Sequence, residues 1–441
     1  MANTKRRSVI KLAGSAAAVA STGMAGILAT GRTPAYAQTK TVHWLRWVDF
    51  VPASDQLMRK ELMPQAEKEL GIKINFETVN GNDLQPRATA AIQSGAGPDL
   101  IQAFNNNTYI YANSVVDLTD LAESVAKAEG GLYKYCRSLS SDGKMFMSMP
   151  WVVIGGMIVY RKSWFDEVGA TSFPKTWVEY REVAKKLKAK GRPIGQTLGH
   201  TFGDAPTFSY PYMWSWGGKE VDADGKTVVI NSKETIESVK FMQGFWKEGC
   251  DEGALAWDDT NNNRAFLSQT ISATLNGASI YIETLRKPDQ YQTEKGTPMN
   301  KDILHAPLPA GPAGQFGMHT YQSDMLMKYS KNQDAAKEFL KWIHAEKNYE
   351  KWFVSQKGFA TPPTVKWEEH KIWGEDPVMA PFKVAAKLGQ APGFAGLPGQ
   401  KAAEALSKYI ITDMYAKAVQ GMPAEDAVKW AEGELKKIYS A

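Results

Sequence analysis

Three strand-like runs begin the part of the chain that follows residue 40: Thr41-Val42-His43-Trp44-Leu45, Ile72-Lys73-Ile74-Asn75-Phe76 and Leu100-Ile101-Gln102-Ala103-Phe104. Residues 54–70 and 83–94, which separate these runs, are predicted to be helices, and a capping serine and a glycine bound the first of them. The order β-α-β-α-β is typical of a doubly wound sheet. We therefore predict an α/β fold.

The predicted sheet indicates where a ligand would bind. In sheets of this kind, ligands bind beyond the carboxyl ends of the strands. Trp47 and Asp49 follow the first predicted strand, and Asn106 and Asn107 follow the third. We expect these four side chains to contact a ligand.

Strand-like and helical segments continue to the end of the chain. Residues 157–160 are predicted to form a strand, and residues 176–189 a helix. Residues 221–229 are expected to form a hairpin that turns on Asp-Gly, and because they lack the bidentate glutamate of a calcium loop we favour a structural turn over a metal site. Amphipathic helices are predicted at 332–345 and 423–438.

Length and charge narrow the class of protein. A chain of 441 residues with 43% hydrophobic side chains suggests two or three globular domains. Five of its 52 basic side chains lie in residues 1–37, which hold no acid, so the remainder carries 47 basic and 47 acidic side chains. A neutral body has no long-range attraction to nucleic acid or to an anionic membrane, and neither is predicted as a partner.

The first 37 residues have the three parts of a secretory signal peptide. A basic segment with paired arginines precedes uncharged residues 12–31, and Ala35-Tyr36-Ala37 offers an A-x-A cleavage site. The arginine pair resembles the twin-arginine export motif. We predict cleavage after Ala37 and a periplasmic location. A retained membrane anchor is the alternative, but eight of the 20 uncharged residues are Gly, Ser or Thr and would bind lipid weakly.

Common catalytic and metal-binding motifs are absent from the sequence. It contains no Gly-x-Ser-x-Gly, Walker, His-Glu-x-x-His or Cys-x-x-Cys motif, and its six histidines show no ligand spacing. We therefore predict no cofactor, no metal and no enzymatic activity. Export would allow Cys136 and Cys250 to pair, but we favour two separate buried thiols.

Aromatic and amide side chains in loop-like contexts are the other candidates for a binding site. Trp151 follows a proline, Tyr210 and Trp214 precede a pair of glycines, and Asn276 is followed closely by Tyr281. Flat rings cover the C–H face of a sugar, and amides satisfy hydroxyls that are costly to bury unpaired. The alternative is that these rings pack in a hydrophobic core and contact no ligand.

Five short motifs occur along the chain in a familiar order: SGAGPDLI at 94–101, VYRK at 159–162, PKTW at 174–177, LNG at 275–277 and NQDAAKEF at 332–339. Together they resemble the extracellular solute-binding proteins of carbohydrate ABC importers, the family of maltose-binding protein. The resemblance extends over essentially all of the chain after the signal peptide.

This resemblance implies a fold of the periplasmic-binding-protein type II class, with two α/β lobes joined by a hinge that the chain crosses three times. Lobe 1 would contain residues 38–152 and 315–361, and lobe 2 residues 153–314 and 362–441. The family implies capture of a carbohydrate-type solute in the cleft between the lobes. It also implies delivery of that solute by a monomer to the membrane permease of the importer.

The resemblance also implies roles for individual residues. Asp49 lies near the position of a sugar-binding carboxylate, Trp151 at the first crossing and Tyr210 near an aromatic position of lobe 2. His319, just after the second crossing, is a further candidate contact. Other family positions hold Ala103, Ile154, Ser279 and Glu404. These departures favour a smaller or differently shaped solute than a long maltodextrin.

Three alternatives stay open at this point. A glycerol-phosphate-type ligand would need cationic partners, for which Arg46, Arg87 and Arg264 are available. Ferric ion would need clustered tyrosines. A secreted carbohydrate-active enzyme would need two carboxylates across the cleft, such as Asp49 and Asp204.

Overall fold

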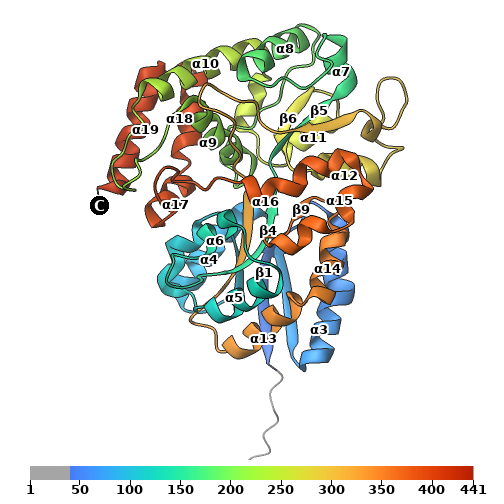
Figure 1. The fold of residues 1–441 in the computed structure, drawn as a ribbon, viewed down its shortest axis with the longest axis vertical. Coiled ribbons are helices and arrows are strands. Elements are labelled where there is room, and N and C mark those ends of the chain that lie inside the picture. Colours follow the sequence, from blue (N-terminus) through green and yellow to red (C-terminus); the bar gives the residue numbers. More distant parts are fainter. Residues whose placement is uncertain (1–39, 441) are drawn as a thin grey trace, which may run out of the picture. The chain divides into compact units, whose positions relative to one another are not determined.

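Two β-sheets organise the chain (Figure 1). The computed structural model describes residues 40–440, and the predicted signal peptide at 1–37 lies outside the described residues. One sheet has six strands in the order β2-β1-β3-β8-β4-β9, and the other has three in the order β6-β5-β7. The part built on the six-stranded sheet is called lobe 1 below, and the part built on the three-stranded sheet lobe 2. The residue boundaries predicted for the lobes stay predictions.

The six-stranded sheet begins with three parallel strands, as predicted: β1 (Thr41–Trp47), β2 (Lys73–Val79) and β3 (Leu100–Phe104). The other members of this sheet run antiparallel to their neighbours: β8 (Thr320–Leu326), β4 (Met149–Ile154) and β9 (Ala360–Thr361). Because β1 and β3 are parallel, their carboxyl ends share one edge of the sheet. The rings of Trp47 and Phe104 are neighbours there, with centroids 5.8 Å apart.

Helices cover both faces of this sheet, with α3 and α14 on one side and α4, α5 and α6 on the other (Figure 1). The helices of lobe 1 are α2 (Pro52–Leu57), α3 (Met63–Leu70), α4 (Gly81–Ser94), α5 (Thr119–Ala128), α6 (Lys134–Ser140), α13 (Gln333–Ile343) and α14 (Glu346–Ser355). The helix predicted at 54–70 is interrupted by a π-helical turn at Met58–Leu62. Pro64, which has no N–H to donate, lies two residues after the end of this turn and explains the interruption.

Lobe 2 is built on a smaller antiparallel sheet of β5 (Met157–Arg161), β6 (Ala273–Asn276) and β7 (Ile303–Ala306). Its helices before β8 are α7 (Lys162–Glu167), α8 (Trp177–Ala189), α9 (Asp204–Trp216), α10 (Lys233–Gly249), α11 (Asn261–Leu267) and α12 (Ser279–Arg286). The predicted strand at 157–160 and the predicted helix at 176–189 are confirmed. Only a single bridge between Val221 and Val228 forms around the predicted Asp-Gly turn, so this segment is a turn without flanking strands.

The last part of the chain is helical, and the predicted amphipathic helices at 332–345 and 423–438 are confirmed by α13 and α19. The helices after β9 are α15 (Ile372–Glu375), α16 (Ala385–Leu388), α17 (Gln400–Ser407), α18 (Ile410–Val419) and α19 (Ala424–Tyr439). In Figure 1, α18 and α19 lie beside α9 and α10 of lobe 2, and α17 packs on α18 and α19. The closing helices therefore enlarge lobe 2.

The two cysteines are buried and unbonded, which confirms the prediction of separate thiols. Between residues 40 and 440, no helix is long and apolar enough to cross a membrane. Over the same range, no cluster of His, Cys, Asp and Glu is placed to hold a metal ion.

Candidate functional site

A cavity lies between the two lobes, at the carboxyl edge of the six-stranded sheet. Lobe 1 contributes α4, β3 and the segment after β3, and lobe 2 contributes the loop before α9 and the segment from α17 to α18. The lining residues are Gly81, Asn82, Leu84, Gln85, Ala88, Gln102, Ala103, Phe104, Asn105, Asn107, Tyr111, Phe202, Pro206, Met325, Leu406, Ser407 and Tyr409. None of these side chains carries a charge. Amides, hydroxyls and rings therefore set the chemistry of the cavity.

Local structure explains why α4 presents its first turn to this cavity. The Asn80 side chain caps the helix by accepting a hydrogen bond of 2.9 Å from the N–H of Asn82. Capping satisfies one of the free N–H groups at a helix start and fixes where the helix begins. Asn82 and Gln85 consequently lie on the first helical turns and face lobe 2.

Gln102 lines the cavity and is hydrogen-bonded to a second buried glutamine, Gln322. Gln102 on β3 donates from Nε2 to Oε1 of Gln322 on β8 over 3.1 Å, and its own Oε1 accepts from the N–H of Trp47 over 3.3 Å. Nε2 of Gln322 and Oδ1 of nearby Asn106 are buried without a hydrogen-bond partner. Such unpaired groups are costly to bury.

Direct hydrogen bonds join the lobes around the cavity. Gln85 donates to Oγ of Ser407 over 3.0 Å, and Ser407 donates to Oδ1 of Asn107 over 3.3 Å. Asn106 donates from Nδ2 to the carbonyl of Pro398 over 3.4 Å. The structure therefore has the lobes closed on each other.

The ring of Phe202 comes from the loop before α9 in lobe 2 and packs against aromatic side chains of lobe 1. It stacks on Phe104 with centroids 4.2 Å apart and meets Trp47 edge-on at 5.5 Å. Trp47 also contacts Phe50 at 4.9 Å. A second, smaller cavity lies between the lobes beside Phe202, lined by Trp47, Val48, Phe50, Asn80, Gly81, Asn82, Thr201, Phe202, Asp258, Asp259 and Thr260.

Two buried carboxyl groups of lobe 2, Asp204 and Asp259, lie next to this second cavity. Burial raises the pKa of Asp204 well above its usual range, and the neighbouring charge of Asp259 raises it further. Burial also raises the pKa of Asp259 to about 6, although the N–H groups of Gly203 and Asp204 donate to it. Asp204 accepts from Nδ2 of Asn262 over 2.6 Å, and Nδ2 of Asn276 lies 3.5 Å away.

Three of the four residues predicted at the strand ends lie at or beside the interlobe space. Asn107 lines the larger cavity, Trp47 lines the smaller one, and Asn106 bonds across the lobes. Asp49 lies apart from both cavities. Its carboxylate accepts from the N–H of Val51, from Ser54 and from Gln356, so it organises the start of α2.

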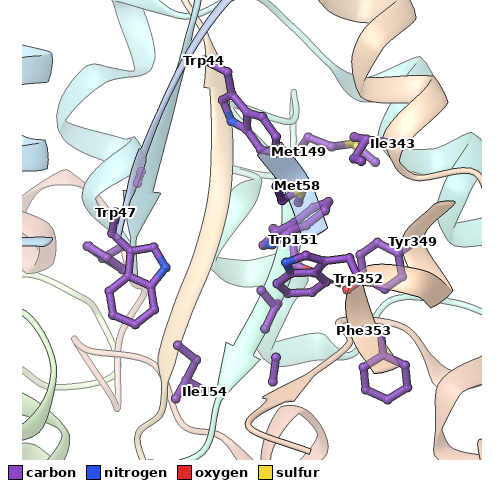
Figure 2. Close-up of a cluster of buried hydrophobic side chains, with 14 of the residues drawn as sticks. Trp44, Trp47, Met58, Met149, Trp151, Ile154, Ile343, Tyr349, Trp352 and Phe353 are labelled. Carbon is purple, nitrogen blue, oxygen red and sulfur yellow. Dashed lines mark hydrogen bonds between the residues drawn. The ribbon is translucent and has the colours of Figure 1, made fainter. Parts of the chain in front are cut away.

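Trp151, Tyr210 and Trp214 lie inside the cores, where the alternative interpretation of the aromatic residues put them. Trp151 is fully buried on β4, with its ring 4.5 Å from that of Trp352 and 5.1 Å from that of Tyr349 (Figure 2). Tyr210 and Trp214 belong to α9, which is buried on nearly its whole circumference. In this conformation the three rings have no surface to offer a ligand.

The remaining predicted residues are spread over the molecule. Asn276 ends β6 and donates to Oδ1 of Asn263 over 2.6 Å, close to Asp204. The Tyr281 hydroxyl donates to Asp376 over 2.7 Å. His319 accepts from the N–H of Gly156 and lines a separate cavity of about 360 Å³ at the hinge.

Several lining residues were not predicted. Asn82 and Gln85 directly follow β2, a parallel neighbour of β1, so the rule that located Trp47 and Asn106 would also have found them. Phe202 and Ser407 belong to lobe 2 and lie far along the sequence from that sheet edge. No local pattern marks them, because only closure of the two lobes brings them to the cavity.

Comparison with known proteins places the chain among binding proteins. The sequence model of the family described as "Bacterial extracellular solute-binding protein" matches residues 52–350. A relative, the diacetylchitobiose binding protein DasA of Streptomyces coelicolor, is 25% identical over 395 residues, which is 86% of this chain and 85% of that protein.

Solved structures of similar fold cover nearly the whole chain. Maltose-bound T. maritima MalE3 has a TM-score of 0.75 at 20% identity, covering 90% of this chain and 100% of its own. A solute-binding protein from Thermotoga lettingae bound with α-D-tagatose has a TM-score of 0.76 at 18% identity, covering 91% and 100%. The fold is thus the two-lobed type II fold that the sequence motifs predicted.

Proposed function

The chain belongs to the bacterial extracellular solute-binding protein family, and we propose from this that it captures an uncharged carbohydrate between its lobes for an ABC importer. The observation that carries the proposal is the uncharged lining of the larger interlobe cavity. Amides and hydroxyls satisfy sugar hydroxyls, and rings cover the apolar faces of the sugar.

The same lining argues against the sugar-phosphate alternative. A buried phosphate needs cationic or N–H partners, since an unpaired buried charge is expensive. Arg46 lies inside lobe 1 with its guanidinium 4.7 Å from the Trp44 ring, Arg87 pairs with Glu77, and Arg264 bonds to Thr260. None of the three arginines lines either interlobe cavity.

We propose a binding protein rather than an enzyme for the same site. A glycosidase needs two carboxylates that are free to act on one bond. Both oxygens of Asp49 already accept hydrogen bonds within lobe 1, and Asp204 is held by Asn262. The family description names binding and no reaction.

Closure of the lobes is the proposed mechanism of capture. Gln102 and Asn107 of lobe 1 and Ser407 of lobe 2 face the same cavity, so a solute that contacts both lobes binds the closed form better than the open one. That difference in affinity shifts the population toward the closed form. The closed monomer then docks on the membrane permease, after export to the periplasm and removal of residues 1–37.

The names of the relatives guide the choice of solutes. Similar proteins are named for, or were solved with, a diacetylated chitobiose, maltose, tagatose and laminaribiose. All four are neutral mono- or disaccharides, which agrees with the uncharged cavity. We therefore propose a neutral mono- or disaccharide as the solute.

A thermal-shift and calorimetry panel tests the proposal on the protein without residues 1–37. We expect at least one neutral saccharide or polyol to raise the melting temperature and to bind with micromolar Kd, about 8 kcal/mol. Its phosphorylated derivative should bind far more weakly. Tight binding of only phosphorylated or acidic sugars, or of no sugar at all, would contradict the proposal.

A further inference from the structure

The cavity at the hinge is separate from the two interlobe cavities and shares no lining residue with either of them. We call it the hinge cavity. Its walls are mainly apolar side chains, chiefly Met157, Leu308, Phe316, Val384, Ala385 and Leu388. Among the described residues that line it, Gln315 and His319 are the polar side chains, and none is an aspartate, glutamate, lysine or arginine.

The walls of the hinge cavity come from both sides of the hinge. Met157 begins β5 and Leu308 follows β7, so these two buried side chains belong to lobe 2. Ala385 on α16 packs in one hydrophobic cluster with Tyr135, which lies on α6 of lobe 1. Leu388, at the end of α16, is 65% exposed where the cavity meets solvent. A molecule in this cavity would therefore contact lobe 2 and a helix that packs on lobe 1.

The imidazole of His319 presents one hydrogen-bond donor to the hinge cavity. Its Nδ1 accepts from the N–H of Gly156 over 3.1 Å, and burial lowers the pKa of the ring to about 4. The ring is therefore neutral at pH 7 and carries its hydrogen on Nε2. The side chain is only 4% exposed, and Nε2 makes no hydrogen bond to any residue between 40 and 440.

The hinge cavity offers few other polar partners. Nε2 of Gln315 donates to the carbonyl of Leu308 over 2.7 Å, so this amide nitrogen is already engaged. Burying the many hydroxyls of a saccharide without partners is costly. The cavity is therefore unsuited to a saccharide, and it suits a largely apolar molecule with a single acceptor for the N–H of His319.

We propose that the hinge cavity is a second ligand site, which binds a small, uncharged and largely apolar organic molecule. A carbonyl or ether oxygen of this molecule accepts the hydrogen bond from Nε2 of His319. Its apolar body lies against Met157, Leu308 and Ala385, and removal of these surfaces from water supplies the affinity. The site goes beyond the proposed function and does not depend on it.

Two neutral probes of nearly the same shape test the assignment. The first is para-fluoroacetophenone, which has a carbonyl oxygen, and the second is para-fluoro-α-methylstyrene, which has a methylene group in place of that oxygen. Fluorine NMR titration gives the Kd of each probe. Because water hydrates the ketone better than the alkene, each variant is compared with the wild type by the ratio of the two Kd values. This comparison cancels the difference in hydration and leaves the effect of the hydrogen bond.

Two substitutions remove the donor in different ways. His319→Asn keeps an oxygen that can accept from the N–H of Gly156 but deletes Nε2. A Cβ added at Gly317 would lie 3.1 Å from Nε2 of His319, so Gly317→Ala places a methyl group against the donor. The matched controls are His43→Asn on β1 and Gly433→Ala on α19, where the added Cβ has no neighbour within 4 Å. Circular dichroism and melting temperature verify that each variant is folded.

We expect both probes to bind the wild type. His319→Asn and Gly317→Ala should each bind the ketone about tenfold more weakly relative to the alkene, and both controls should keep the wild-type ratio. Failure of both probes to bind the wild type, an unchanged ratio in either folded variant, or an equal change in the controls would overturn the proposal. No saccharide takes part in this experiment, so each of these outcomes leaves the proposed function standing.

Discussion

Gln102 connects three parts of the site through one side chain. It holds the N–H of Trp47, donates to Gln322 and lines the interlobe cavity. Nε2 of Gln322 is buried without a hydrogen-bond partner. A solute hydroxyl that accepts from this pair would gain a partner that the protein alone does not supply.

We expect Gln102→Ala to weaken solute binding by roughly tenfold, since a lost hydrogen bond with a buried partner costs ~1–2 kcal/mol. Calorimetry with the saccharide identified in the panel measures the change. Gln243→Ala is the control, because Nε2 of Gln243 donates to the carbonyls of Ala418 and Met422 within lobe 2. The control should lose stability and keep its affinity, and an equal loss of affinity in both variants would contradict a direct role for Gln102.

The pKa of Asp204 predicts a pH-dependent effect of its replacement. Burial raises this pKa above the usual value near 4, so the folded protein holds the proton more tightly than the unfolded chain. The contribution of Asp204 to stability is therefore greatest below about pH 4 and is lost as the pH rises through the folded pKa. Asp204→Asn stays neutral, and we expect its melting temperature relative to the wild type to increase from pH 4.5 to pH 7.5.

The free energy of unfolding of Asp204→Asn, relative to that of the wild type, should rise over the same pH interval. Asp224→Asn is the matched control. Backbone and Thr227 donors lower the pKa of exposed Asp224 to about 2, so its contribution is present above pH 4 and changes only in more acidic solution. If the difference in melting temperature between Asp204→Asn and the wild type did not vary with pH, the raised pKa of Asp204 would be contradicted.

Single residues of the site were only partly predictable. Trp47, Asn106 and Asn107 follow from the rule that ligands bind beyond strand ends, because β1 and β3 are where the sequence predicted them. Trp151 and Trp214 have neighbours in sequence that suggest loops, but tertiary packing buries both completely. A proline or glycine next to an aromatic residue does not indicate whether its ring is exposed or buried in the core.

At the scale of elements, side chains that cap helix N-termini fix where α4 begins at the cavity and where α8 begins in lobe 2. Asn80 caps α4 beside the cavity, and Thr176 caps α8 on the far part of lobe 2 with a complete capping box to Glu179. The box satisfies N–H groups that the helix itself leaves free. An N-terminal cap therefore fixes the start of α4 beside the cavity and stabilises α8 in lobe 2.

Thr176→Ala removes the hydroxyl that accepts from the N–H of Glu179, and we expect it to lower the free energy of unfolding by about 1 kcal/mol. Chemical denaturation measures this loss. Val178→Ala on the same helix is the control: Val178 is exposed, so its replacement should be close to neutral. Solute affinity should be unchanged in both variants, and a loss in Val178→Ala equal to that in Thr176→Ala would show that the cap is not the cause.

Element prediction succeeded where local pattern and tertiary role agree. The β2 region alternates in sequence, β1 and β3 are short strand-like runs next to predicted helices, and α13 and α19 each have an apolar face. β8, which joins β3 to β4, was not predicted, since its seven residues are all buried and show no alternation. Its pairing with β3 links residues more than 200 positions apart, which no local signal encodes.

At the scale of the whole molecule, short segments of chain connect the six-stranded sheet of lobe 1 to the three-stranded sheet of lobe 2. β4 of lobe 1 ends at Ile154 and β5 of lobe 2 begins at Met157, so only Gly155 and Gly156 separate the two sheets at the first crossing. His319, near the start of β8, accepts from the N–H of Gly156 over 3.1 Å. This bond ties the passage from β4 to β5 to the return of the chain into β8.

The two-lobe architecture was predictable because its signals are spread along the whole chain. Motifs from residue 94 to residue 339 occur in family order, and each belongs to a segment that builds or connects the sheets. The closed arrangement itself was not predictable. It depends on contacts such as those of Phe202 with Gly81, which join segments of different lobes.

Because both native thiols are buried, the protein can be labelled selectively with dyes at cysteines introduced on its surface. Cys136 and Cys250 are enclosed, and burial raises the pKa of each thiol, so a maleimide dye would leave them unmodified. A new cysteine introduced on the surface of each lobe would then be the only reactive pair. Dyes at these positions would report opening and closing as energy transfer in a single molecule, with the wild-type interior intact.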